Sequence, residues 1–282
     1  MIEASKANPP QRRRERGERN IALRAKRKIL VLCALWVSAA NLSAFSTRAA
    51  ERVVSLNLCT DQMLVLLAPT KVAALSPLAR DPALSFVAYE AARFPIVRAS
   101  AEAVLRLHPD LVLAAPFGAQ TTLSLLEQKG TPVLRIDLPQ DFPGIRSQTR
   151  LLARALGVPR RGETLLAAMD VSLDGLPHPS HPLRALVWEP RGHTAGPGTL
   201  MDAVLRSAGL INASDGRSVG LEALLQQPPD LLVVPEAPEF PSLATALFDH
   251  PVLAGLHRRA IPPALTICAG PFTAQAAVKL AQ

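Results

Sequence analysis

Two stretches of this chain, residues 102–114 and 222–234, are copies of one another, and this repeat constrains the fold more than any other feature. They align without gaps at an offset of 120 residues. Each copy predicts a short helix, ended by Pro109 or Pro229, and then a continuously apolar strand. A helix ends before proline because the proline ring clashes with the preceding turn. Apolar strands of this kind are typical of a parallel sheet that is covered on both faces.

The distance between the copies is too long for a solenoid repeat and indicates two similar α/β lobes. The order of elements around the copies supports this interpretation. A strand over 52–56, a turn and a helix over 62–68 open the first half. A strand over 184–188, a loop rich in glycine and proline, and a helix over 199–208 open the second half in the same order.

Polar residues at the boundaries of these elements have structural explanations. Asp110 and Asp230 occupy the turn between helix and strand in the two copies, where a structural role is favoured over catalysis. Thr60 or Asp61 is expected to cap the helix over 62–68, because their side-chain oxygens can accept from the first free N–H groups of a helix.

Between the halves, residues 145–156 and 161–173 have helical periodicity, and a proline-rich loop over 177–182 follows. The connection is therefore one long helix or a helix pair. The predicted fold class is α/β, with two lobes of parallel-type sheets joined by a long connecting helix and a ligand cleft between the lobes. The expected organisation is a signal peptide over 1–50, an N-terminal lobe over 51–144, a connecting helix over 145–176 and a C-terminal lobe over 177–282.

The net charge of +8 is confined to the first 50 residues. These contain eleven Lys or Arg and three Asp or Glu, so residues 51–282 hold 20 basic and 20 acidic residues. A body with no net charge and no basic patch is poorly suited to a phosphate backbone, and we expect no nucleic-acid partner.

The leader has the pattern of an export signal. A basic stretch ends at Lys28, an apolar run covers 29–40, and small residues lead to Ala49 and Ala50. The apolar run is shorter than the roughly 20 residues that span a bilayer, but it suits a signal peptide. We expect a periplasmic protein that is cleaved near Ala49 or Ala50; an anchored sensor domain with an uncleaved leader is the alternative.

Two cysteines, Cys59 and Cys268, remain after such cleavage. Export favours oxidation, but cysteines this far apart in the sequence need not pair. Cys59 is expected to be a buried turn residue, with a half-cystine or a ligand contact as the alternatives. No cysteine or histidine spacing indicates a zinc site, and neither a resident metal nor a cofactor is expected.

Taken in order, these pieces resemble the periplasmic binding proteins of ATP-driven importers for cobalamin and ferric siderophores. The resemblance rests on the opening Arg-Val-Val-Ser-Leu of 52–56, the two repeat units, the connecting helix, and residues 196–200 leading into 208–212. It implies a monomer that captures a metal chelate and delivers it to the membrane permease of an ABC transporter. It further implies that Glu102 and Glu222 dock onto the permease, although a glutamate in the first turn of a helix gains about 0.3–1 kcal/mol from the helix dipole alone.

The ligand is expected between the lobes, because open α/β sheets bind ligands at the carboxyl ends of their strands. Trp188 is suited to stacking on a flat ligand or to the core, and Arg80 and Arg191 could pair with ligand carboxylates. His193 is a polar loop residue that could also hold a metal. The ligand-binding candidates are Asn57, Cys59, Thr60, Asp61, Arg80, Phe117, Trp188, Glu189, Arg191, His193 and Phe272.

The same residues leave other functions open. Haem is an alternative ligand, but its iron commonly takes tyrosine or histidine, and the chain has one tyrosine, Tyr89. A free transition-metal ion needs three or four converging ligands. An exported α/β hydrolase or transferase could use the same crevice, yet no nucleophile elbow, phosphate loop or His-Glu-x-x-His motif is present. No catalytic residue is therefore assigned, and a binding protein is expected.

Overall fold

The computed structural model describes residues 49–237 and 245–282. The expected signal peptide lies outside this range except for Ala49 and Ala50. Within the described residues, no helix has the length and apolar character needed to cross a membrane.

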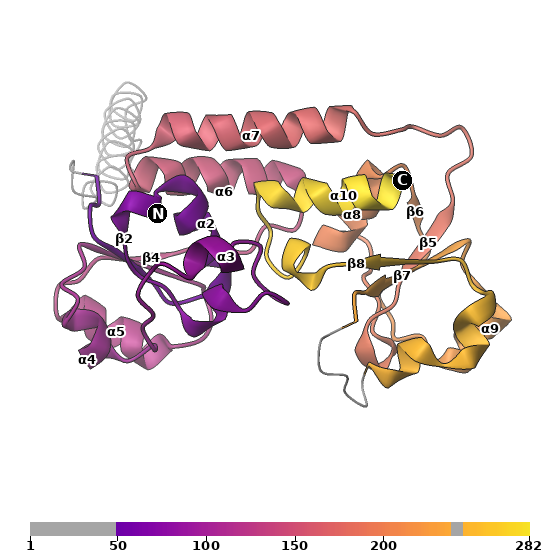
Figure 1. The fold of residues 1–282 in the computed structure, drawn as a ribbon, viewed down its shortest axis with the longest axis horizontal. Helices are drawn as coiled ribbons and strands as arrows, with labels where there is room; N and C mark the ends of the chain where they lie inside the picture. Colours follow the sequence, from indigo (N-terminus) through magenta and orange to yellow (C-terminus); the bar gives the residue numbers. More distant parts are fainter. Residues whose placement is uncertain (1–48, 238–244) are drawn as a thin grey trace, which may run out of the picture. The chain divides into compact units, whose positions relative to one another are not determined.

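The first half contains a four-stranded parallel sheet (Figure 1). Its strands are β1 (Val53–Ser55), β2 (Val72–Ala74), β3 (Leu111–Ala114) and β4 (Val133–Arg135), in the order β2-β1-β3-β4. Every residue of the two central strands, β1 and β3, is buried. Burial on both faces explains why the sequence of β3 is wholly apolar.

The second half contains a sheet of the same design. Its strands are β5 (Arg184–Val187), β6 (Ile211–Asn212), β7 (Leu231–Pro235) and β8 (Arg258–Ile261), in the order β6-β5-β7-β8. The two repeat copies supply β3 and β7, and each lies beside the first strand of its own sheet: Val112 pairs with Val54, and Leu232 pairs with Leu186. The predicted α/β fold class, with a parallel sheet in each half, is confirmed.

The aspartates of the two repeat copies, Asp110 and Asp230, bind the backbone at the start of the neighbouring central strand. Asp110 accepts hydrogen bonds from the backbone N–H groups of Glu51 (2.8 Å) and Arg52 (2.9 Å), just before β1. Asp230 accepts from the backbone N–H of Arg184 (2.8 Å) at the start of β5. Both carboxylates therefore satisfy backbone donors at the beginning of a central strand, which is the structural role expected for them.

Each sheet has helices on both faces (Figure 1). In the first half, α4 (Ala101–Leu105) and α5 (Gln120–Gln128) pack on one face, and α2 (Leu58–Leu67) packs on the other. In the second half, α9 (Leu221–Gln226) packs on one face, and α8 (Leu200–Ser207) and α10 (Ala274–Ala281) pack on the other. The core beneath α8 and α10 continues into the first half, where it includes Leu58 and Phe142.

The connection between the halves is a helix pair, α6 (Phe142–Ala155) and α7 (Pro159–Asp174). The turn between them contains Gly157, which has a left-handed φ of 69°. Arg150 pairs with Glu163 across the two helices (2.8 Å). Helix α7 packs on α6 in the first half and on α10 in the second, as Figure 1 shows.

Gly162 lies at a close contact between α6 and α7. A Cβ at this position would lie 2.6 Å from the Cβ of Ala153. We expect Gly162→Ala to lower the free energy of unfolding by about 1 kcal/mol, because overpacking costs about 1–3 kcal/mol and the better helix propensity of alanine returns only about 1 kcal/mol. Urea unfolding measures the change.

The matched control is Gly175→Ala, at the end of α7. The nearest atom to a Cβ there is 3.6 Å away, an ordinary contact. We expect this variant to be neutral or more stable. Equal stability of the Gly162 and Gly175 variants would argue against the close packing of α6 on α7.

Candidate functional site

The carboxyl ends of the two sheets are brought together by the segments that follow β1 and β8. β1 leads directly into α2, and β8 leads into a loop over 262–270. A disulfide between Cys59 of α2 and Cys268 of this loop joins the two segments. Ligands of open α/β sheets bind outside the carboxyl ends of the strands, so the loops that follow the strands form the candidate site.

Cys59 is a half-cystine, and the expectation of a buried turn residue is wrong. It lies in the first turn of α2, with a Cα–Cα distance of 5.1 Å to Cys268. A pair separated by 209 residues has no local sequence signal. Only the packing of the second half against the first brings the two thiols within bonding distance.

The start of α2 differs from the sequence prediction. The helix begins at Leu58, and its N-cap is Asn57, whose side chain accepts a hydrogen bond from the backbone N–H of Cys59 (2.9 Å). Thr60 is buried and shares a hydrogen bond with Ser55 (2.7 Å). These candidates hold the helix start in place, and only Asn57 and Cys59 are partly exposed.

Asp61 is fully buried beside the same helix start. Its carboxyl accepts hydrogen bonds from the backbone N–H (3.1 Å) and the hydroxyl of Ser76, which follows the carboxyl end of β2. Burial raises the pKa of Asp61 to about 7, and hydrogen bonds from Ser55 and Ser76 oppose the rise. The side chain therefore joins α2 to β2 and changes protonation near neutral pH.

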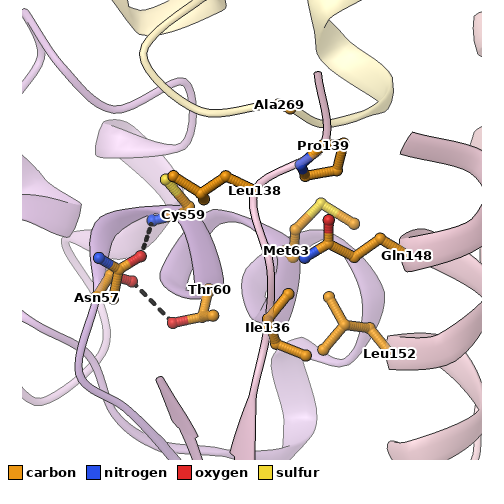
Figure 2. A pocket seen from close by; sticks show the side chains of 10 residues that line it. All are labelled: Asn57, Cys59, Thr60, Met63, Ile136, Leu138, Pro139, Gln148, Leu152 and Ala269. Carbon is orange, nitrogen blue, oxygen red and sulfur yellow. Dashed lines mark hydrogen bonds between the residues drawn. The ribbon is translucent and has the colours of Figure 1, made fainter. Parts of the chain in front are cut away.

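A small hollow, with room for about one water molecule, lies between α2, the segment after β4 and the second half (Figure 2). Figure 2 shows Ala269 of the second half above Leu138, Pro139 and Met63 of the first. Three sequence candidates meet in this hollow: Asn57, Cys59 and Thr60. Most of the remaining lining is apolar, with Gln148 as a polar exception.

In the second half, the loop after β5 is built around Trp188. This side chain is fully buried, donates a hydrogen bond from Nε1 to the carbonyl of Val219 (2.8 Å), and packs edge-on against Phe248 at 5.6 Å. Of the two roles left open for Trp188, the structure shows the core residue. Its ring has no exposed face for a ligand to stack on.

The buried tryptophan supports a tight turn that presents polar side chains. Arg191 has a left-handed φ of 64°, and the following Gly192 has no room for a Cβ because Val219 O would lie 2.5 Å from it. The backbone N–H of Glu189 donates a hydrogen bond to the carbonyl of His193 (2.8 Å). The side chains of Glu189, Arg191 and His193 are all exposed. Non-glycine residues held at positive φ concentrate at functional sites.

The loop after β3 presents an exposed aromatic ring. Phe117 is 61% exposed, and left-handed backbone at Gly118 and Ala119 shapes the turn before α5. Arg80 is also exposed, after β2, and donates a hydrogen bond to the carbonyl of Phe94 (2.5 Å). Phe272 is instead buried, and its ring stacks on that of Phe86.

Two exposed apolar residues in loops after strands were not among the candidates from sequence. Leu78, after β2, is 48% exposed, and Ile267, after β8, is 47% exposed. Exposed apolar side chains mark a binding surface where they form a contiguous patch, whereas single ones are common. From sequence, each looked like an ordinary loop residue, because exposure cannot be inferred from a single apolar position.

The two repeat glutamates both lie in the first turn of a helix and are exposed. Glu102 of α4 forms an ion pair with Arg106 (3.0 Å), one turn along the same helix. Glu222 of α9 stands at the matching position, where the residue one turn later is Gln226. The repeat therefore places equivalent carboxylates on the two halves, and the one in the first half carries a neighbouring cation.

Across the described ranges, no group of three or more His, Cys, Asp or Glu side chains is placed to hold a metal ion. The arrangement that the structure does show is a pair of parallel sheets whose strand-end loops meet, with exposed apolar and polar side chains on both. This is the geometry of a two-lobed solute-binding protein.

Comparison with known proteins supports the assignment to solute-binding proteins. Residues 53–256 match the family model described as a periplasmic binding protein, and the chain belongs to this family. Its members are binding proteins. The comparison with curated proteins gave no significant match.

Several solved structures are similar over most of the chain. The periplasmic heme-binding protein RhuT from Roseiflexus sp. RS-1 is 25% identical, with a TM-score of 0.64, covering 83% of this chain and 98% of its own. The heme-binding protein HutB of Vibrio cholerae is 19% identical, with a TM-score of 0.68, and the coverages are 82% and 97%. The vitamin B12-binding protein BtuF of Vibrio cholerae is 19% identical, with a TM-score of 0.59, and the coverages are 82% and 95%.

Proposed function

We propose that this protein is the periplasmic component of an ABC importer and that it captures a metal chelate with a large apolar face. The observation that carries the proposal is the set of exposed apolar side chains in strand-end loops of both halves, Leu78, Phe117 and Ile267. An apolar surface with a few polar groups is typical of small-molecule sites. Arg80, Arg191 and His193 supply such groups from the same loops.

The shape of these groups favours a metal-centred macrocycle or a compact ferric siderophore. An aromatic ring such as Phe117 can stack on a flat conjugated surface, and arginine forks can pair with acidic groups at its edge. Cobalamin and ferric siderophores are the first candidates. Haem is the second, supported by the heme-binding relatives and by Tyr89, which is 91% exposed and could offer a phenolate to iron.

A thermal-shift screen tests this proposal directly. Protein purified from the periplasm of cells expressing the full chain is melted with cobalamins, ferric siderophores, haem, and zinc or manganese salts. A true ligand at 100 times its Kd should add about 2.7 kcal/mol of stability. Stabilisation by a simple metal salt, and by none of the chelates, would refute the chelate proposal.

Phe117→Ala tests the stacking role. We expect the Kd for the chelate to rise roughly 30-fold, which corresponds to about 2 kcal/mol, because truncating a central aromatic contact commonly costs this much. Isothermal titration measures the affinity. Leu125→Ala is the matched control, since Leu125 is 43% exposed on α5 and should leave the Kd within about twofold. Equal effects of the two variants would remove Phe117 from the site.

For docking, we propose that Glu102 and Glu222 contact cationic side chains of the permease. Glu222→Ala should reduce uptake in a reconstituted importer by tenfold or more at unchanged chelate affinity, because loss of one partner of a buried charge pair costs about 2–5 kcal/mol. Glu90→Ala, which removes another exposed carboxylate of the first half, should have no effect. Normal uptake by the Glu222 variant would leave the helix dipole as the explanation for this residue.

Export with cleavage near Ala49 or Ala50 completes the proposal. Lys71 donates a hydrogen bond to the carbonyl of Ala50 (2.8 Å), a contact that cleavage after Ala49 would keep and cleavage after Ala50 would remove. Intact mass of the periplasmic protein tests the site; a mass that includes residues 1–48 would favour the anchored alternative.

A further inference from the structure

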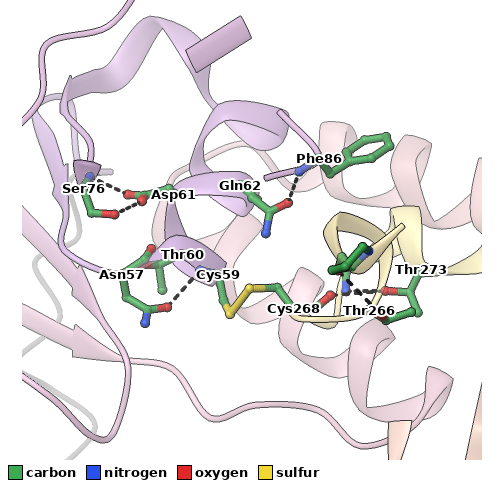
Figure 3. The surroundings of a disulfide bond; sticks show 12 residues. Asn57, Cys59, Thr60, Asp61, Gln62, Ser76, Phe86, Thr266, Cys268 and Thr273 are labelled. Atoms are coloured by element: carbon green, nitrogen blue, oxygen red, sulfur yellow. Dashed lines mark hydrogen bonds between the residues drawn. A yellow bond between two sulfur atoms is a disulfide. The ribbon is translucent and has the colours of Figure 1, made fainter. Parts of the chain in front are cut away.

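The disulfide forms a second covalent connection between the two halves, in addition to α7. Figure 3 shows Cys59 on α2 and Cys268 on the loop after β8, joined by the S–S bond. The loop over 262–270 leads into the stacked Phe272 and then into α10. Through the bond, this loop of the second half is attached to the helix that starts at the carboxyl end of β1.

Non-covalent contacts reinforce the same junction. The rings of Phe86 and Phe272 stack at 4.7 Å with an interplanar angle of 10°. The backbone N–H of Phe86 donates to the side chain of Gln62 (2.7 Å), one turn along α2 from Cys59. The second half thus contacts the first at two points, Cys59 of α2 and Phe86, and Phe86 is itself hydrogen-bonded to α2.

Two buried polar groups lie next to Phe86, one on α2 and one on the preceding residue. Among the described residues, Gln62 Nε2 and Ser85 Oγ are buried without a hydrogen-bond partner. Unsatisfied buried donors are costly, so these two groups do not add to the stability of this region.

The loop held by the bond carries part of the candidate site. Ile267, immediately before Cys268, is one of the exposed apolar residues proposed to contact ligand, and Ala269, immediately after it, lines the hollow. On the far side, Thr273 accepts from the backbone N–H of Gly270 (3.1 Å) and fixes the end of the loop. The position of Ile267 and Ala269 relative to the first half therefore depends on the disulfide.

The two sulfur atoms are unequally accessible. Cys59 is partly exposed and lines the hollow, whereas Cys268 is 1% exposed. Cys59 is therefore the more accessible half of the bond to an attacking thiolate, and Cys268 is the leaving group. Thiol–disulfide exchange depends on such access.

We propose that the Cys59–Cys268 disulfide is a reducible clamp that fixes one wall of the binding site, and that its reduction by a dithiol loosens this wall and speeds ligand release. The reductant is a dithiol small enough, or protruding enough, to reach Cys59. Its thiolate attacks Cys59 Sγ to form a mixed disulfide, and Cys268 leaves as a thiolate that takes up a proton. The second thiol of the reductant then loses its proton and attacks the reductant's sulfur in the mixed disulfide. Cys59 leaves as a thiolate and takes up a proton, and the reductant becomes a disulfide.

Hydrogen exchange tests the clamp without any ligand. Periplasmic protein is treated with dithiothreitol or with its oxidised form, and exchange is followed by mass spectrometry. We expect amide exchange in residues 262–273 and in the first turns of α2 to rise at least tenfold after reduction, with little change in β3 and β7. The Cys59→Ser/Cys268→Ser variant should show the same fast exchange and no response to dithiothreitol.

Ligand release supplies the second measurement and rests on the proposed function. The dissociation rate of whichever chelate the thermal screen identifies should rise at least fivefold in the reduced protein. Phe272→Ala, which keeps the disulfide, should respond to dithiothreitol as the unmodified protein does. Unchanged exchange in 262–273 after complete reduction would overturn the clamp, whatever the ligand proves to be. Faster exchange with no chelate binding would retain the clamp and reject the proposed function.

Discussion

Replacing both Cys59 and Cys268 by serine will lower the free energy of unfolding by about 3–5 kcal/mol. The bond links residues separated by 209 positions, so in the unfolded chain it restricts a very long loop, and long loops gain the most from cross-linking in the chain-entropy account. Urea unfolding of the double variant and of the oxidised parent, analysed by midpoint and slope, measures the difference.

The same experiment contains its own control. Dithiothreitol should lower the stability of the parent to that of the double variant and should not affect the double variant. If the two proteins unfold at the same urea concentration under oxidising conditions, the bond is absent in solution or does not stabilise the fold.

Between about pH 4 and pH 7, the folded protein should lose stability through Asp61 as the pH rises. The folded-state pKa of Asp61 is about 7, against an ordinary value of 3.8. The folded state therefore holds a proton over this range that the unfolded state has released. The contribution is fully present below pH 4 and is lost as the pH passes through 7, and it amounts to roughly 4 kcal/mol at most.

Asp61→Asn should remove this pH dependence, because an amide resembles the protonated carboxyl and can still accept from the backbone N–H of Ser76. Ser76→Ala should act in the opposite way and move the pKa of Asp61 above 7, since the Ser76 hydrogen bonds lower it. Urea unfolding as a function of pH and carbon NMR of the Asp61 carboxyl provide the two readouts. A carboxyl of Asp61 that titrates near pH 4 would contradict the buried position.

The fold was predictable because its main signals are periodic. The repeat of 102–114 at 222–234 predicted two equivalent helix–strand units, and the structure places them as α4–β3 and α9–β7 beside the first strands of separate sheets. Apolar runs bounded by proline and aspartate specify such units locally. The helical periodicity of the connector also predicted helix there, but it did not decide between one long helix and a helix pair that divides at Gly157.

The site was less predictable because the sequence does not determine which face of the sheet a side chain at the end of a strand points to. Val187 and Trp188 are consecutive and pack in different cores, on opposite faces of the second sheet. Successive residues of a strand alternate between faces, so a tryptophan at this position could point to either. Phe272 was ambiguous for a different reason: its stacking partner, Phe86, comes from the other half.

The polar candidates near α2 illustrate a second difficulty. Asn57, Thr60 and Asp61 follow a parallel strand, where ligand-binding residues are often found. Residues that cap a helix have the same chemistry and the same location. Hydrogen bonds to Cys59, Ser55 and Ser76 occupy their side chains in the structure, and sequence alone does not distinguish these two uses.

Anomalous diffraction from crystals grown with the identified chelate is the most direct test of how this protein works. We expect one strong peak at the absorption edge of cobalt or iron, between the strand-end loops, with Phe117 of the first half and Arg191 or His193 of the second in contact with the chelate. A peak on the outer surface of either half, away from these loops, would contradict it.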